Sequence, residues 1–416
     1  MKEKTAINPP CRRQNYIIFT IAVFAAYAFF GFSENAKGPA IPRIQADFNI
    51  TELQLGLLFA ANAAGYLIAC MYTAALAKKI GIKTCMLIAL CVIAVSGIFI
   101  CFSGGYLTLL AAFFVLNLGN GMLEISLSVI AAATFTKNTG AMMNLAHFFY
   151  GAGAVFSPVV SAGLMAASFG SNVFGWRYMY LAVLGMALIP AVIALIGRLE
   201  KKDYNKKKTG YAVILRNPTL WLTVMIFTPG AICEMGVGAW LVNYLEKACG
   251  YSAESAALSL TLFFVCFTLT RLIIGPVIDK VGFINSLAVL TAFAGIMIVI
   301  GVLRGEAGVT LLIIAGIGIA PVFPTVMAVV SKLFSEELDV AVTSITTVTG
   351  ILTIPANLLL GGIIQLARTA FASTAADAGV GAAYSAGYLF LGLCCFVSAA
   401  AATVLRSRQK KIGRLV

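Results

Sequence analysis

Three carboxylates stand inside long apolar stretches of this sequence, where an ionisable side chain is expensive. Of the sixteen acidic residues, only Glu34, Glu124 and Glu234 cannot be assigned to a loop, a tail or the end of an apolar stretch. A charged group in the hydrocarbon core of a bilayer costs about 2.5–3.5 kcal/mol on insertion scales, so each is a candidate for function. Binding a proton removes the cost of a bare carboxylate in such surroundings, which makes proton exchange the chemistry to consider first.

The single histidine of the chain lies in another apolar stretch, together with two further polar residues. Asn144, His147 and Tyr150 are spaced three residues apart, so they can share one face of a helix. A histidine changes charge near neutral pH, which suits a proton relay or a polar cavity. A structural hydrogen bond within a packed core is the alternative that the sequence leaves open.

Other polar and aromatic side chains in the apolar stretches are candidate ligands or structural contacts. Lys37 follows Glu34 by three residues, which permits either a local ion pair or a shared contact with a solute. Buried amides such as Asn120 and Asn357 need partners in the membrane and serve either as ligands or as ties between helices. Trp240, six residues after Glu234, is either a ring that stacks on a sugar or an anchor at the membrane interface.

The composition identifies the elements that must position these residues. Hydrophobic residues make up 61% of the 416 residues and charged residues only 11%, whereas soluble chains are about 45–50% apolar and about 25% charged. Too few charges remain to cover a water-facing surface, which excludes a soluble enzyme, a nucleic-acid-binding protein and a disordered scaffold. The ten cysteines show no metal-binding spacing, so we expect no metal and no cofactor.

Twelve apolar stretches are long enough to cross a bilayer as helices. A basic, polar segment separates the first six from the last six. The sequence therefore predicts an all-α membrane protein with a cytoplasmic N-tail, an N-terminal six-helix bundle, a basic linker, a C-terminal six-helix bundle and a C-tail, at residues 1–15, 16–197, 198–218, 219–405 and 406–416. The predicted spans are 16–42, 55–77, 84–103, 106–135, 141–168, 176–197, 219–244, 252–278, 286–303, 308–334, 340–367 and 382–405.

The net charge of +13 comes mainly from basic residues in the predicted loops and tails. If both termini are cytoplasmic, most of the 29 Lys and Arg residues fall on the cytoplasmic side, in the tails, the central linker and the even-numbered loops. This asymmetry is the one that orients helical membrane proteins. We expect a multi-pass protein of the cell (inner) membrane with both termini in the cytoplasm.

A loop motif narrows the class. Residues 275–282 read GPVIDKVG, which matches the pattern G-x-x-x-D-[RK]-x-G, while the corresponding loop of the first half has Lys78 at the Asp position. With twelve spans and a basic central linker, the sequence resembles the major facilitator superfamily over its whole length. The resemblance implies two pseudo-symmetric bundles and a cytoplasmic gate formed by Asp279, Lys280 and Arg271. For Arg271 the alternative is a side chain that snorkels to the interface.

Shorter stretches resemble the fucose and hexose proton symporters of that superfamily. They are GMLEIS at 121–126, MNLAHFFYGAGA at 143–154 and EMGVGAWL at 234–241. The resemblance implies that Glu124 takes part in proton coupling. Gly38 stands where the fucose branch has an Asp, with Glu34 one helical turn earlier, which argues against fucose itself. The charge of Lys37, unexpected for a neutral sugar, leaves acidic substrates open.

These observations lead to one functional expectation and one alternative. We expect a monomeric proton symporter that imports a small polar solute, most simply a sugar, by alternating access. The proton-coupling candidates are Glu124, His147 and Glu34, and the substrate-binding candidates are Glu234, Asn144, Trp240, Asn120, Tyr150, Asn357 and Lys37. The alternative is a proton-coupled efflux antiporter for drugs or metabolites, because residues 153–158 nearly match the G-x-x-x-G-P pattern of exporters. One histidine and no hydrolase or metalloprotease motif argue against an enzyme.

Overall fold

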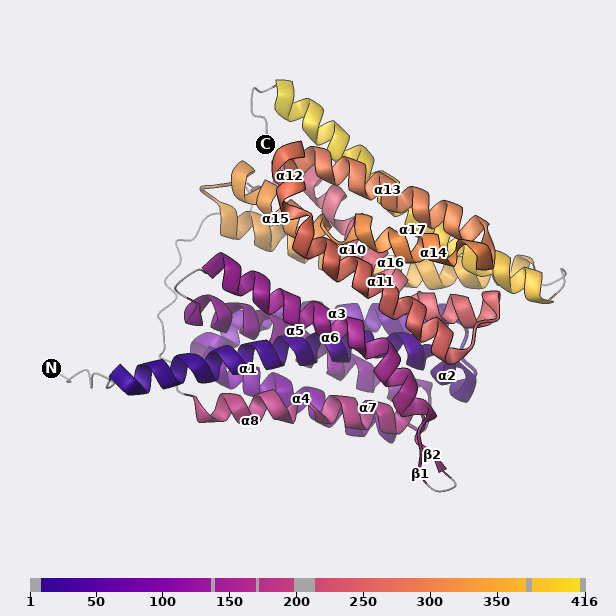
Figure 1. The fold of residues 1–416 in the computed structure, drawn as a ribbon, viewed down its shortest axis with the longest axis horizontal. Helices are drawn as coiled ribbons and strands as arrows, with labels where there is room; N and C mark the ends of the chain where they lie inside the picture. The colour runs from indigo at the N-terminus through magenta and orange to yellow at the C-terminus, as the bar shows by residue number, and fades with distance from the viewer. Residues whose placement is uncertain (1–8, 136–138, 170–171, 198–213, 372–375, 412–416) are drawn as a thin grey trace. The chain divides into compact units, whose positions relative to one another are not determined.

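A computed structural model describes residues 9–135, 139–169, 172–197, 214–371 and 376–411 of the chain. Within these residues it contains twelve helical segments that are long and apolar enough to cross a membrane. The predicted number of spans and the all-helical class are thereby confirmed. Two strands of two residues each, β1 (Ser168–Phe169) and β2 (Asn172–Val173), form a small antiparallel hairpin between α6 and α7 (Figure 1).

The helices of the first half are α1 (Pro9–Asn35), α2 (Lys37–Phe48), α3 (Glu52–Ile80), α4 (Ile82–Cys101), α5 (Tyr106–Thr134), α6 (Thr139–Ala166), α7 (Gly175–Gly185) and α8 (Leu188–Ile196). Those of the second half are α10 (Pro218–Cys249), α11 (Ala253–Ile273), α12 (Gly275–Val281), α13 (Phe283–Leu303), α14 (Val309–Ile319), α15 (Val322–Leu333), α16 (Leu338–Ala370) and α17 (Ala376–Lys411). A short 3-10 turn, η1 (Gly305–Gly308), precedes α14.

The first span is longer than the sequence suggested. We predicted its end at Pro42, but α2 continues to Phe48 and ends at Asn49, which adopts a left-handed conformation with φ of 53°. A turn at Ala36 restarts the helix, so Pro39 lies in the first turn of α2, where a missing N–H removes no intrahelical hydrogen bond. The tenth span is interrupted between α14 and α15, at Ala320 and Pro321.

The chain forms two compact units. Unit 1 comprises residues 1–34, 65–154 and 168–206, and unit 2 comprises residues 35–64, 155–167 and 207–416. In unit 1, α4 packs along α5 and also contacts α7 and α8. The second unit therefore includes α2 and the start of α3, which we had predicted as parts of the N-terminal bundle. The predicted boundary at 198–218 stays a prediction, because residues 198–213 lie outside the described part of the chain.

Unit 2 is built around α10, α13 and α17. Helix α17 runs beside both α10 and α13 (Figure 1). Their buried aliphatic side chains, with those of α15 and α16, form one hydrophobic core that includes Leu220, Val224, Leu287, Val326, Val330, Ile345 and Leu405. The helix α2 lies against α10 and α11 in the same unit.

Candidate functional site

Two of the predicted polar residues of unit 1 are in direct contact. The side-chain amide of Asn120, on α5, donates a hydrogen bond through Nδ2 to Oε1 of Glu34, on α1. Asn120 is only 1% exposed, whereas Glu34 is half-buried. The amide thus supplies a hydrogen-bond donor to a carboxylate that lies in an apolar environment.

Glu124 lies one helical turn after Asn120 on α5, and it is also half-buried. Its carboxylate interacts electrostatically with that of Glu34. Within the described residues Glu124 makes no hydrogen bond or ion pair. Two of the three carboxylates singled out from the sequence are therefore neighbours, and a proton bound to one of them would relieve the repulsion between them.

The predicted residues of α6 lie against α1 in unit 1. The ring of His147 is 5.3 Å from the ring of Tyr27, and the ring of Tyr150 is 5.3 Å from that of Phe30. His147 is exposed, so it is not a packed core histidine. The side chain of Asn144 lies outside the described residues. Tyr27 was missed by the sequence reasoning, although it precedes Glu34 by seven residues and so shares its helix face.

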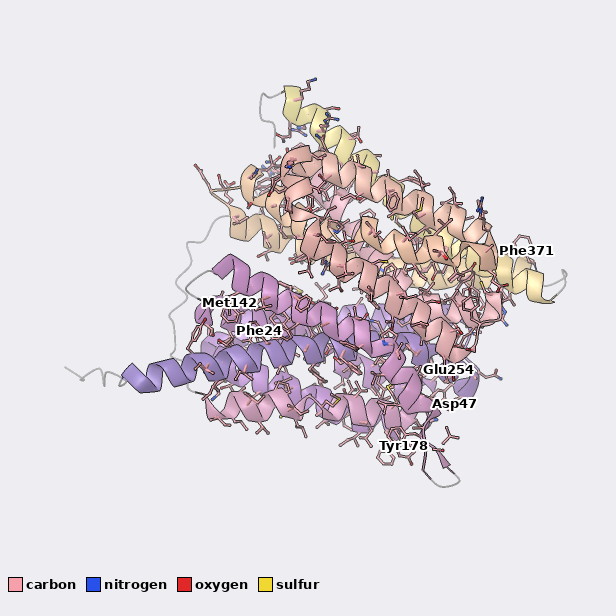
Figure 2. The ribbon with its side chains drawn as sticks, in the orientation of Figure 1. Phe24, Asp47, Met142, Tyr178, Glu254 and Phe371 are labelled. Atoms are coloured by element: carbon pink, nitrogen blue, oxygen red, sulfur yellow. The ribbon has the colours of Figure 1, made fainter. Side chains whose placement is uncertain are left out.

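Two glycines bring α1 and α6 into backbone contact. A Cβ atom on Gly31 would overlap the backbone carbonyl of Tyr150, and one on Gly153 would overlap that of Ala28. Only residues without side chains allow this approach, which fixes the spacing of the polar residues on the two helices. Figure 2 labels Phe24 on α1, whose ring stacks on that of Phe149 at 4.8 Å.

In unit 2 the third carboxylate, that of Glu234, lies near Arg271, which the sequence assigned to a cytoplasmic gate. Nη2 of Arg271, on α11, lies 3.7 Å from Oε2 of Glu234, on α10. The side chains of Arg271 and Glu234 are 24% and 31% exposed, respectively. Asp279 and Lys280 are exposed on α12 and, among the described residues, form no ion pair. The gate that we predicted from these residues stays a prediction, but Arg271 lies with the substrate candidate Glu234.

The remaining candidates of unit 2 are buried or half-buried. Trp240 is 1% exposed, and its ring lies 5.8 Å from that of Phe59 and 6.3 Å from that of Tyr384. It is therefore neither an interface anchor nor open to a solute in this structure. Asn357 donates to the carbonyl of Thr353 within its own helix, and Lys37 is half-buried at the start of α2.

A polar network that the sequence did not indicate joins α2 and α3 to α10 and α16 within unit 2. We call it the α2–α10 network, and it consists of Arg43, Gln45, Glu52, Asn243, Glu246, Lys247 and Arg368. Figure 2 labels Asp47 of α2 and Glu254 of α11 at the ends of two helices that pack together near it. The residues of the α2–α10 network lie near predicted loops, where charged side chains are ordinarily solvated.

The contacts of the α2–α10 network are short. Gln45 accepts hydrogen bonds from Asn243 at 2.6 Å and from Lys247 at 2.7 Å, and Arg43 pairs with Glu246. Nη1 of Arg368 lies 2.6 Å from Oε1 of Glu52. Beside that pair the backbones of α3 and α16 touch, because a Cβ on Gly56 would lie 3.0 Å from the Cα of Gly361.

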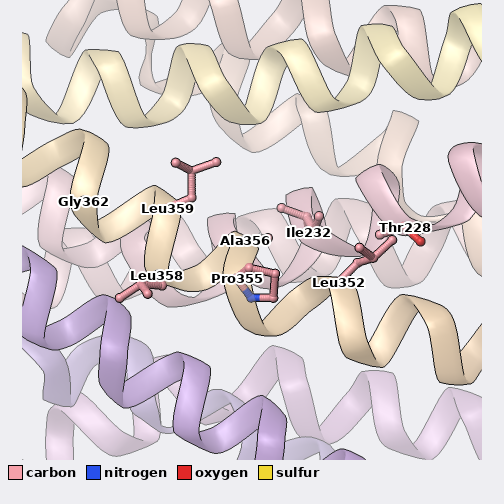
Figure 3. Close-up of a pocket in the computed structure, with 8 residues that line it drawn as sticks. All are labelled: Thr228, Ile232, Leu352, Pro355, Ala356, Leu358, Leu359 and Gly362. Carbon is pink, nitrogen blue, oxygen red and sulfur yellow. The ribbon is translucent and has the colours of Figure 1, made fainter.

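An apolar groove of about 640 Å³ lies between α10 and α16. Figure 3 shows the residues that line it: Thr228, Ile232, Leu352, Pro355, Ala356, Leu358, Leu359 and Gly362. The hydroxyl of Thr228 is already hydrogen-bonded to that of Thr349, at 2.8 Å. The groove offers few partners to the hydroxyl groups of a sugar and suits an apolar surface instead. Among the described residues, no group of three or more His, Cys, Asp or Glu side chains could hold a metal ion.

Comparison with curated proteins finds distant relatives among membrane transporters. An uncharacterized MFS-type transporter of Yersinia pestis is 24% identical over 361 residues, which are 83% of this chain and 89% of that protein. A probable sulfoacetate transporter of Cupriavidus necator is 25% identical over 273 residues, and the match covers 59% of each chain.

Solved structures share the fold. A bacterial homologue of the human lysosomal transporter Spinster superposes with a TM-score of 0.80 at 14% identity, covering 96% of this chain and 98% of that one. The D-xylose–proton symporter gives 0.71 at 14% identity, with 92% and 97% covered. The Escherichia coli fucose:proton symporter FucP gives 0.61 at 18% identity, with 94% and 99% covered.

A family profile also matches most of the chain. The Major Facilitator Superfamily profile matches residues 23–356, which include most of both halves of the chain. With twelve candidate spans among the described residues, this match identifies a multi-pass membrane transporter rather than an enzyme. The chain belongs to the major facilitator superfamily.

Proposed function

We propose that this transporter imports a small polar solute, a sugar or sugar derivative, in symport with protons. The observation that carries the proposal is the group formed by Glu34, Asn120 and Glu124 in unit 1. Two carboxylates that interact within apolar spans are costly when both are charged, and a proton on one of them removes most of that cost. The names of the xylose and fucose symporters, which share the fold, support a sugar as the solute.

In the proposed cycle Glu124 accepts a proton from the outside, and the solute then binds to polar residues that include Glu234. The loaded protein changes conformation by alternating access and releases both to the cytoplasm. Glu34, held by Asn120, keeps a second negative charge beside the proton site. The basic tails and central linker favour cytoplasmic termini in the cell (inner) membrane, and we propose a monomer as the working unit.

Transport by the purified protein in proteoliposomes tests this proposal. Glu124→Gln should abolish the accumulation of a sugar driven by a proton gradient while leaving the counterflow of labelled sugar intact. Glu254→Gln is the matched control, because Glu254 is an exposed acid at the start of α11. Accumulation that survives Glu124→Gln would contradict the coupling role, and the absence of any sugar uptake by the unmodified protein would contradict the sugar.

An exporter of apolar compounds is the second candidate, and the groove between α10 and α16 favours it. Its lining is almost wholly aliphatic. Cells with and without the protein should then differ in their susceptibility to cationic dyes. Equal susceptibility, together with sugar uptake, would exclude the exporter.

A further inference from the structure

Arg271 is held in place by contacts that point it away from the nearest helix end. Its Nε donates a hydrogen bond to the carbonyl of Ala320 at 2.9 Å, and its Cζ lies 4.2 Å from the ring centre of Phe267. Phe267 is one turn further from the end of α11 at Ile273 than Arg271 is. A snorkelling arginine would extend the other way, towards that end.

The carbonyl of Ala320 is available to Arg271 because a proline stands four residues after it. In a continuous helix the carbonyl of Ala320 would accept from the N–H of residue 324, but that residue is Pro324, which has none. The interruption between α14 and α15 therefore exposes a carbonyl that fixes the guanidinium from one side. The side chain is positioned in advance, so little of its conformational freedom is lost when it binds a ligand.

Most of the donors of this guanidinium are unused. A guanidinium carries five N–H donors, and within the described residues that of Arg271 makes a single hydrogen bond, to Ala320. The carboxylate of Glu234 neutralises it from 3.7 Å, beyond hydrogen-bonding distance. Both side chains remain partly exposed. A purely structural ion pair would be expected to close into a direct, bidentate contact.

We propose that Arg271 binds the carboxylate of an anionic sugar derivative, such as a hexuronate, and that Glu234 is the counter-ion which the substrate carboxylate replaces. The inference deepens the proposed function and rests on it, since it names the substrate class of the same transporter. The two terminal nitrogens of a guanidinium match the two oxygens of a carboxylate in a planar, bidentate arrangement. A neutral sugar would leave these donors unused and the ion pair undisturbed.

Binding of matched sugar pairs to purified protein tests the inference. The dissociation constants of galacturonate and galactose, and of glucuronate and glucose, would be measured by calorimetry. We expect the uronate to bind about tenfold or more tightly than its neutral partner, because hydrogen bonds between charged groups are the stronger ones. Arg271→Gln should bring the ratio close to one, and Arg271→Lys should give an intermediate ratio because lysine keeps the charge but not the planar fork.

Glu234→Gln should change the ratio in the opposite direction. Removing the competing carboxylate frees the guanidinium, so the preference for the uronate should increase. A structural ion pair predicts instead that both substitutions weaken binding of either sugar alike. Arg304→Gln is the control, since Arg304 is exposed after α13 and has no ion-pair partner in the described part of the chain. Thermal unfolding of each ligand-free variant establishes that it is folded.

The outcomes separate the two proposals. Equal affinity for uronates and neutral sugars, or a ratio that Arg271→Gln leaves unchanged, would overturn the inference while the sugar transporter stands. A failure to bind or transport any member of either pair would overturn both. A preference for the uronate that disappears with Arg271→Gln, together with uronate accumulation that requires Glu124, would support both.

Discussion

The guanidinium of Arg368 contacts a carboxylate, that of Glu52, which is almost completely buried. Nη1 of Arg368 is 2.6 Å from Oε1 of Glu52, the side chain of Glu52 is 1% exposed, and its Oε2 has no hydrogen-bond partner among the described residues. Lys247 approaches the same carboxylate only to 3.7 Å. Arg368 therefore provides the closest neutralising contact of a buried charge that links α3 to α16.

Replacement of Arg368 should destabilise the protein. Arg368→Gln leaves the buried carboxylate with Lys247 alone, and we expect a loss of about 1–3 kcal/mol. Arg304→Gln, at an exposed arginine without an ion pair in the described residues, should change stability by no more than about 0.5 kcal/mol. The measurement is the midpoint of thermal unfolding in detergent. Adding Glu52→Gln should recover part of the loss, and a double variant no better than the single one would contradict this explanation.

The contact between α1 and α6 should not tolerate a methyl group. Gly31→Ala places a Cβ atom into the backbone of Tyr150, so the helices must separate or shift, at a cost of about 1–3 kcal/mol. Gly163→Ala, also on a helix of this pair, is the control because no heavy atom lies within 4 Å of the added Cβ. Equal midpoints of thermal unfolding for the two variants would show that the helices are less close than the structure has them.

The side-chain amide of Asn120 should contribute more to stability than another amide of the same helix. Asn120→Ala removes the hydrogen-bond donor to Glu34 and leaves its carboxylate less well compensated, so we expect about 1–3 kcal/mol of destabilisation. Asn117→Ala is the matched control, since Asn117 donates only to the carbonyl of Phe113 in its own helix. Combining Asn120→Ala with Glu34→Gln should give a cost smaller than the sum of the two single changes, measured by a double-mutant cycle.

Trp240 should behave as a core residue. Trp240→Ala should cost about 3–5 kcal/mol in unfolding free energy, because it empties a site enclosed by Phe59 and Tyr384. Trp221→Ala should cost much less, since Trp221 is 45% exposed. If Trp240→Ala abolished sugar binding without changing stability, the substrate contact predicted from the sequence would be favoured over a role in the core.

Hydropathy made the number of spans predictable, because each span carries its apolar signal in its own residues. The ends were less predictable: Gly38, Pro39 and Pro42 favour an end of the first span, but α2 continues past them to Phe48. The three carboxylates were found because charges in apolar spans are rare. The sequence alone could not show that Trp240 is enclosed, because the rings around it belong to two other helices, α3 and α17.

Contacts between distant segments account for the rest of the site. Glu34 and Asn120 are 86 residues apart, and nothing in either stretch specifies the other. The position of Arg271 depends on Ala320, which is 49 residues away and available only because of Pro324. Prolines in the tenth span could have suggested a free carbonyl, but not which donor would reach it. The α2–α10 network was missed because its charged residues lie where solvated loops were expected.

The contact between Gly56 and Gly361 determines how α3 and α16 can come apart. Where two glycine backbones meet, no side chains interlock, so the helices have smooth surfaces that can slide or separate without rotamer changes. Van der Waals contact between the backbones resists separation, and the polar contacts beside it, Glu52 with Arg368 and the N–H of Glu52 with Gln365, add to that resistance. Separation of α3 from α16 at this point would therefore take the buried carboxylate of Glu52 away from the guanidinium of Arg368 and leave it with Lys247.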